Sequence, residues 1–233
     1  MKTSIIVLLF VSISFNSFTQ TRDKLKVIAK ELSNYSTYQT NCNYTFSMPF
    51  GGTTLNYEAL IVTQQIPTDT LADCYYNFST KEEYRNENFN DFSMYFKNAV
   101  YSSYKGKVKK TKFEEKPKAF TDLKIGEGFR PAIQRSPQLY YITPYQIAQR
   151  IDEIIEEKNS KIVQMPDTII SNEVCIKFFI TTITSSASNI LELCFHKKHG
   201  YPIFYRNDSE SKVGNQFRMA YFKDTKIGRA SCR

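Results

Sequence analysis

The sequence has no tryptophan, only two histidines, and neither a Cys-x-x-Cys nor a Gly-x-Ser-x-Gly motif in its 233 residues. The missing motifs exclude a dithiol redox centre and a nucleophile elbow from this stretch of chain. His196 and His199 share one turn with Lys197 and Lys198, whose charges repel a metal cation. We interpret the histidines as turn residues; metal ligation is the alternative, but no nearby cysteine or carboxylate completes a ligand set. We therefore identify no catalytic residue and expect no metal and no cofactor.

The chain begins with a segment typical of a signal peptide. Lys2 supplies the positive start, Ile5–Phe15 the apolar centre, and small residues precede the expected cut near Gln20. The apolar run is too short for a transmembrane helix, although a membrane-anchored N-terminus is the alternative. We expect residues 1–19 to be removed and the mature protein to be exported to the periplasm, without a transmembrane span.

The last eight residues, 226–233, have the sequence that a translated sequencing adapter would encode. We hypothesise that the native sequence stops near Thr225, with a genuine tail as the alternative. Residues 20–225 are then one domain with a sizeable core. The net charge of +8 includes four basic residues in the two end segments, so +4 remains. This mild excess does not indicate a nucleic-acid partner.

The stretch Ile169–Arg206 predicts three antiparallel strands, with the first turn at Ser185–Ser186. The predicted register of its first hairpin gives one apolar face and, on the other face, a charge pair and two cysteines in line. Its apolar face pairs Val174 with Phe195, Ile176 with Leu193 and Phe178 with Leu191. Its other face pairs Cys175 with Cys194, Lys177 with Glu192 and Phe179 with Ile190. A disulfide between Cys175 and Cys194 and two free thiols are equally compatible with this pattern.

Two amphipathic helices are expected. Pro144–Lys158 begins with a proline suited to the first helical position and carries an apolar stripe that includes Ile147, Ile151 and Ile154. The first helix, near residues 22–35, buries Leu25, Ile28, Ala29 and Leu32. Two helices cannot cover both faces of a large sheet, so we predict an α+β fold in which they pack on the concave face of a strongly curved antiparallel sheet.

Two further segments carry expectations. The lysine-rich Lys107–Phe113 is interpreted as a solvated edge strand, with an anionic-lipid or nucleic-acid patch as the alternative. The polar residues Thr80–Asp91 are expected to form a loop.

The helix stripe and the apolar strand face allow two interpretations. They pack against each other as plain core, or they line a cleft for an acyl chain or another apolar ligand. The residues that would line the cleft are Ile147, Ile151, Ile154, Ile176, Phe178, Leu191, Leu193 and Phe195.

The hairpin Leu191–Tyr205, with its short polar turn before Tyr201-Pro202, resembles a hairpin of the LolA/LolB-like lipoprotein-carrier superfamily. The wider layout over Lys24 to Phe222 is most similar to the N-terminal module of exported TlpA-type thioredoxin-like disulfide reductases. The segments that carry this likeness are Phe129–Pro131, Pro144–Lys158, Cys175–Ile180 and Gly214–Phe222.

The resemblance implies an incomplete eleven-stranded barrel with a lidding helix and a hydrophobic cavity. We therefore expect an exported, non-catalytic half-barrel that binds a lipid, a lipoprotein or an apolar partner segment. The alternative is the accessory domain of a truncated thiol–disulfide reductase, whose catalytic thioredoxin-like domain would lie beyond Thr225. Whether the full-length protein is an enzyme is thus left open.

Overall fold

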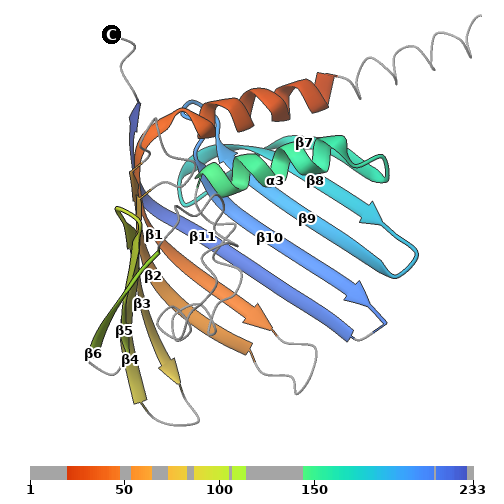
Figure 1. Cartoon of the computed structure of the whole chain (residues 1–233). Coiled ribbons are helices and arrows are strands. Elements are labelled where there is room, and N and C mark those ends of the chain that lie inside the picture. Colours follow the sequence, from red (N-terminus) through yellow and green to blue (C-terminus); the bar gives the residue numbers. More distant parts are fainter. Residues whose placement is uncertain are drawn as a thin grey trace, which may run out of the picture.

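The computed structural model describes residues 20–47, 54–64, 73–82, 87–104, 107–113, 144–212 and 214–229. These residues form one antiparallel sheet of eleven strands and two helices (Figure 1). The strands are β1 Tyr35–Ser47, β2 Thr54–Gln64, β3 Asp73–Glu82, β4 Glu87–Phe96, β5 Ala99–Tyr104, β6 Lys107–Lys112, β7 Ser160–Ile170, β8 Glu173–Ile183, β9 Ala187–His196, β10 Pro202–Ser211 and β11 Gly214–Arg229. The helices are residues 20–33 and α3, Pro144–Glu156.

The sheet consists of two meanders joined through its last strand. Its order is β6-β5-β4-β3-β2-β1-β11-β10-β9-β8-β7, so β11 lies between β1 and β10. Strands β6 and β7 are the two edges of the sheet, which leaves the barrel incomplete. The lysine-rich strand β6 is exposed along most of its length, which confirms the predicted edge strand.

Both helices lie on the same, concave side of the sheet, as Figure 1 shows. Polar contacts fix this placement at two points. Lys24 of the first helix donates to Gln164 on β7, and Glu157 after α3 contacts Thr182 on β8. Gln164 and Thr182 share a face with Phe178, because Gln164 lies opposite Phe178 and Thr182 is four residues further along β8. The expected α+β architecture, a strongly curved antiparallel sheet with helices on its concave face, is confirmed.

The predicted register of the β8–β9 hairpin is wrong by two residues. Ile176 lies opposite Phe195, Phe178 opposite Leu193 and Cys175 opposite His196. The turn sets this register, because the Thr184 hydroxyl accepts the backbone N–H groups of Ser186 and Ala187 and the backbone of Thr184 pairs with that of Ala187. A shift of two residues leaves every side chain on its face, so the apolar pattern alone does not detect it.

The two partners of the predicted charge pair nevertheless meet. Lys177 Nζ lies 2.6 Å from Glu192 Oε1, although Lys177 is directly opposite Cys194 and Glu192 is opposite Phe179. Long side chains reach diagonal neighbours across a pair of strands, and this contact has that geometry.

Two element boundaries also differ from expectation. Strands β3 and β4 extend into Thr80–Asp91, where a loop was expected, and only 83–86 lies outside the described residues. Strand β11 continues to Arg229 and pairs its last residues with β1. The origin of residues 226–233 stays a prediction, as does the cleavage after residue 19, which lies outside the described residues.

Candidate functional site: the concave face of the sheet

Helix α3 presents its predicted apolar stripe to the sheet. Ile147, Ile151 and Ile154 are 1–3% exposed, whereas Asp152 and Glu153 on the opposite side are exposed. Spacings of three and four residues place the isoleucines on one side of a helix, which explains why this segment lies flat on an apolar surface. The stripe, Pro144 at the first helical position and the end of α3 near Lys158 agree with the sequence-based helix.

The strand half of the predicted site lies under this helix. Phe178 and Leu193 are opposite each other, and the ring of Phe178 meets that of Phe195 edge-on at a centroid distance of 6.3 Å. Leu191 lies opposite Ile180 in the next row of the same face. All eight predicted residues contribute to one cluster, in which Ile176 is partly buried and the other seven are at most 7% exposed.

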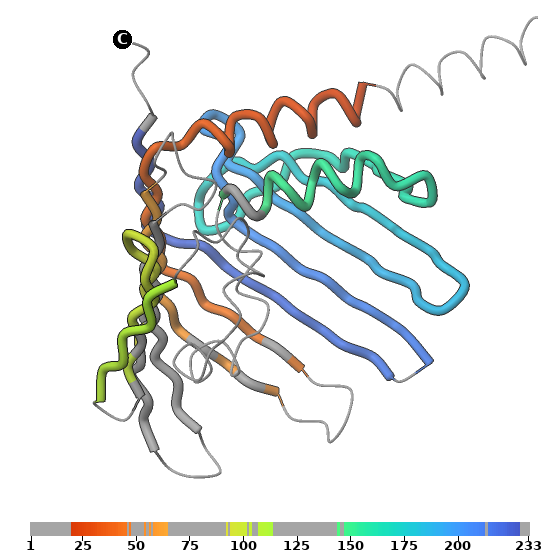
Figure 2. Tube along the Cα trace, in the orientation of Figure 1, coloured from red at the N-terminus to blue at the C-terminus, as the bar shows by residue number. Residues whose placement is uncertain are grey.

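The predicted residues are therefore brought together, and they pack as core. The side chains of α3 occupy the space above β8 and β9, so a ligand could contact Phe178 or Leu193 only after α3 had moved. Helix α3 is thus a cover over an apolar surface in the conformation that Figure 2 traces.

Polar contacts hold α3 at its C-terminal end. Arg22 of the first helix donates to the backbone oxygen of Ile155 at 2.8 Å and to that of Ser160 at 3.1 Å. The Ser160 hydroxyl contacts Glu157 Oε2 at 2.9 Å and the Thr182 hydroxyl at 2.7 Å. A guanidinium that binds the free carbonyl groups at a helix end also complements the negative end of the helix dipole. This end of α3 is tied both to the first helix and to the sheet.

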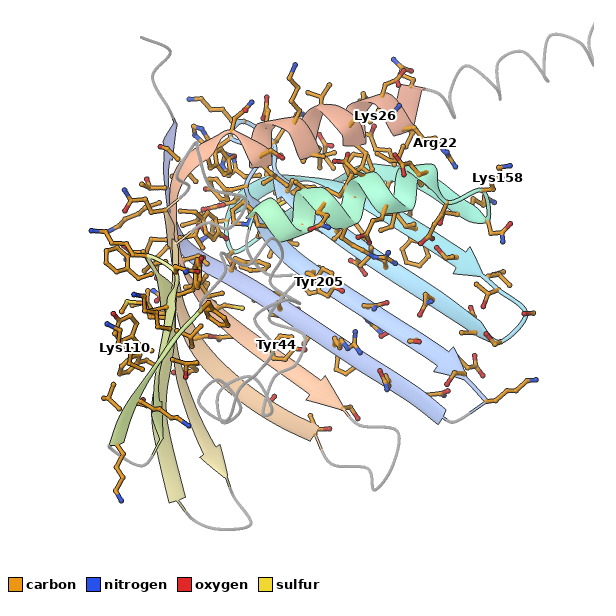
Figure 3. The ribbon with its side chains drawn as sticks, viewed as in Figure 1. Arg22, Lys26, Tyr44, Lys110, Lys158 and Tyr205 are labelled. Atoms are coloured by element: carbon orange, nitrogen blue, oxygen red, sulfur yellow. The ribbon has the colours of Figure 1, made fainter. Side chains whose placement is uncertain are left out.

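The concave face continues beyond α3 onto β10, β11 and β1, which the sequence-based site did not include. Tyr205 lies opposite both Leu193 and Ala220, and Ala220 lies opposite Tyr44, so these side chains share the concave face. Figure 3 labels Tyr205 and Tyr44, which lie on the sheet below α3. Further along the same strands Asn207 is opposite Leu191 and Arg218. The alternation in Gly214–Phe222 did not reveal this surface, because its apolar residues Phe217, Met219 and Tyr221 lie on the opposite face of β11 from Ala220.

The two cysteines for which a disulfide was one alternative are not directly opposite each other. Cys175 and Cys194 are both buried and free, and they lie diagonally across β8 and β9 because of the true register. Diagonal neighbours have Cα atoms about 7–8 Å apart, beyond the usual range for a disulfide. Burial raises the pKa of the Cys194 thiol to about 12 and raises the pKa of Cys175 as well. In this conformation both side chains are unreactive packing groups.

The two histidines belong to the β9–β10 turn, as interpreted from the sequence. The ring of His196 stacks on those of His199 and Tyr201, each at a centroid distance of 4.8 Å. Its Nδ1 atom accepts the backbone N–H groups of Lys198 and His199 at 3.1 Å. The histidines thus close a turn that Tyr35 also joins, by donating to the backbone oxygen of His199. Among the described residues no group of three or more His, Cys, Asp or Glu could hold a metal ion.

No helix within the described residues is long and apolar enough to span a membrane. No protein-family model matches the sequence, and no curated protein matches it.

Several solved structures are similar in shape at low identity. The complex of MucA and MucB from Pseudomonas aeruginosa matches with a TM-score of 0.46 and 10% identity, over 91% of this chain and 58% of that chain. LprF from Mycobacterium bovis matches with a TM-score of 0.44 and 10% identity, over 89% and 93% of the two chains.

A LolA-superfamily protein from Nitrosomonas europaea matches with a TM-score of 0.36 and 9% identity, over 88% of this chain and 93% of that chain. At these identities and TM-scores we draw no conclusion about function from the three structures. Nothing in them bears on the expected relation to thioredoxin-like reductases, which stays a prediction that the gene sequence beyond Thr225 would test.

Proposed function

We propose that this protein is an exported, non-catalytic, LolA-like half-barrel of the periplasm that binds the apolar part of a lipid, a lipoprotein or a partner segment. The observation that carries the proposal is the packing of α3. An amphipathic helix lies with its whole apolar stripe on a continuous apolar surface of β8 and β9, and its described ties to the rest of the molecule gather at its C-terminal end.

This arrangement suits a lid. If α3 pivots about residues 157–160, Ile147, Ile151 and Ile154 leave the sheet, while Arg22 and Ser160 remain close to the pivot. The uncovered surface is apolar and is framed by a rigid sheet, which is typical of sites for small apolar ligands. An acyl chain entering there replaces one set of apolar contacts by another.

The energies of this exchange are comparable. Exposing three buried isoleucine side chains costs about 5–9 kcal/mol, and burying a 12-carbon chain at about 0.8 kcal/mol per methylene stabilises the complex by about 10 kcal/mol. The lid therefore stays closed without a ligand and opens when a long apolar chain is present. Short apolar molecules bury too little surface to hold it open.

Two measurements test the proposal. Native mass spectrometry of the protein purified without detergent should show retained lipid, and dodecanoate should displace the neutral fluorescent probe N-phenyl-1-naphthylamine. Hydrogen exchange should then report a changed exchange rate in α3 on dodecanoate binding, with strand β5, which is distant from β8 to β11 in the sheet, as the internal reference. The absence of both retained lipid and probe displacement would overturn the proposal. Binding without any change in α3 would retain the binding function and reject the lid.

A further inference from the structure

The concave surface of β8 to β11 changes character along its strands. One row across the sheet contains Phe178, Leu193, Tyr205 and Ala220. Two residues further along each strand, toward the turns after β8 and β10, the row contains Ile180, Leu191, Asn207 and Arg218. The row after that contains Thr182, Asn189, Ser209 and Gln216. The surface is thus apolar under α3 and polar at one end of β10 and β11.

We define the polar strip as Asn207, Ser209, Gln216 and Arg218. Its four side chains are all half-buried, so they line the concave surface rather than project into open solvent. The guanidinium of Arg218 donates to Gln216 Oε1 at 2.9 Å, which fixes its direction along β11. The Asn207 side chain starts directly opposite Arg218 on the neighbouring strand, where side chains of one face are within reach of each other.

Arg218 differs from the other charged residues of this part of the sheet because it starts from the concave face. Among the twelve described residues of these three rows it is the only charged one. The other charged side chains of this region, including the pairs Lys177–Glu192 and Arg206–Asp208, start from the opposite face of the sheet. Within these three rows Arg218 is thus the cation, and its charge complements an anion that enters the same concavity.

We propose that the polar strip binds the anionic head group of an amphiphile whose apolar chain lies under α3. This inference rests on the proposed function and names its ligand class: a long-chain carboxylate or a phosphate-bearing lipid. A planar guanidinium donates two parallel hydrogen bonds to either oxyanion, and the Asn207 amide adds a further donor. Because Arg218 lies in the row next to Tyr205 and Leu193, one extended molecule reaches both regions along the strand direction.

The test uses competitors that share a chain and differ in the head group. Dodecanoate, dodecanol and dodecylammonium are compared as competitors that displace N-phenyl-1-naphthylamine from the wild-type protein. We expect dodecanoate to bind about tenfold more tightly than dodecanol, equivalent to about 1.4 kcal/mol of binding free energy. Arg218→Gln should remove this preference and leave the affinity for dodecanol unchanged. Arg218→Lys should retain part of it, because the charge remains. Dodecyl phosphate, compared with dodecanoate, identifies which of the two oxyanions is preferred.

Arg206→Gln is the matched control. It removes the same charge from the neighbouring strand, but from the convex face, where Arg206 pairs with Asp208 at 2.9 Å. The inference is overturned if wild-type protein binds dodecanoate and dodecanol equally, or if Arg206→Gln abolishes the preference as fully as Arg218→Gln does. In both cases the proposed function stands, since the probe and the chains still bind. Failure of every competitor to bind rejects the proposed function itself, and the inference with it.

Discussion

Replacing Phe178 by alanine tests whether the concave face is packed core in the closed molecule. The Phe178 side chain is 0% exposed, lies opposite Leu193 and meets the ring of Phe195 edge-on. Truncation removes these contacts and leaves a space that the rigid sheet cannot collapse to fill. For buried phenylalanines this change destabilises the folded state by about 3–5 kcal/mol.

The matched control is Phe179→Ala. Phe179 is the next residue of β8, so it starts from the convex face, and it is only half-buried. Half of the burial energy of a phenylalanine is about 1 kcal/mol. The two variants lose the same atoms from adjacent positions of one strand, and their difference measures the packing beneath α3.

Urea unfolding followed by circular dichroism provides the measurement. With a dependence on urea of about 2–3 kcal/mol per molar for a domain of this size, Phe178→Ala should lower the midpoint by about 1–2 M. Phe179→Ala should lower it by less than half as much. If Phe178→Ala costs no more than Phe179→Ala, the space under α3 is open and hydrated, and the closed-lid interpretation is wrong.

Three further outcomes follow from single contacts. Gly200→Ala should destabilise the protein by about 1–2 kcal/mol in the same assay, because Gly200 has φ +74° and a Cβ atom there would lie 2.7 Å from Glu31 Oε2; an unchanged midpoint would contradict this. Burial, with smaller contributions from neighbouring positive charges, lowers the pKa of His196 below 6.5, although Glu173 opposes the shift. As the pH decreases through 6.5, the unfolded chain therefore binds a proton at His196 before the folded protein does, and the stability of the folded protein should fall. His196→Asn should flatten this pH dependence, and an equal slope in both proteins would refute the prediction. Lys177→Met should cost about 1–2 kcal/mol at low salt, since it leaves half-buried Glu192 without its partner at 2.6 Å. The loss should shrink as salt is added, because salt screens the wild-type pair; no loss at low salt would contradict the prediction.

The helices were predictable because their signal is local. Ile147, Ile151 and Ile154 repeat at the helical period within one segment, and the structure buries them as expected. The edge position of β6 was equally local, since lysines along a strand indicate that it faces solvent. Both predictions needed only neighbours in the sequence.

Registers and strand extents were less predictable. The period of a strand is two residues, so a shift of two preserves the faces of Phe178 and Cys175, and only the hydrogen bonds of Thr184 in the turn decide between the alternatives. A loop was expected at Thr80–Asp91 because this stretch is polar and lacks the alternation of apolar and polar residues that marks a buried strand face. Pairing with adjacent strands, rather than local propensity, makes it β-structure.

The polar strip could not be found from the sequence, because it depends on which strands are neighbours. Arg218 looks like an ordinary surface arginine until β11 is placed between β1 and β10. That placement puts Arg218 and Asn207 on the same concave face as Leu191, although Arg218 lies 27 positions after Leu191 in the sequence.

The two interpretations of the apolar residues, core and cleft, describe one surface in two conformations. A surface that binds an acyl chain has to be apolar, and an apolar surface left uncovered in water is costly and prone to aggregation. A lid whose own side chains match the surface removes that cost while no ligand is bound. Burial of Phe178, Leu193 and Ile151 in the closed molecule is therefore what a lidded site requires, and the decisive observation is whether α3 moves when a chain binds. The sheet is held by its hydrogen-bonded ladder, whereas the polar contacts of α3 with other elements among the described residues lie at its C-terminal end, so the helix has the lower cost of movement.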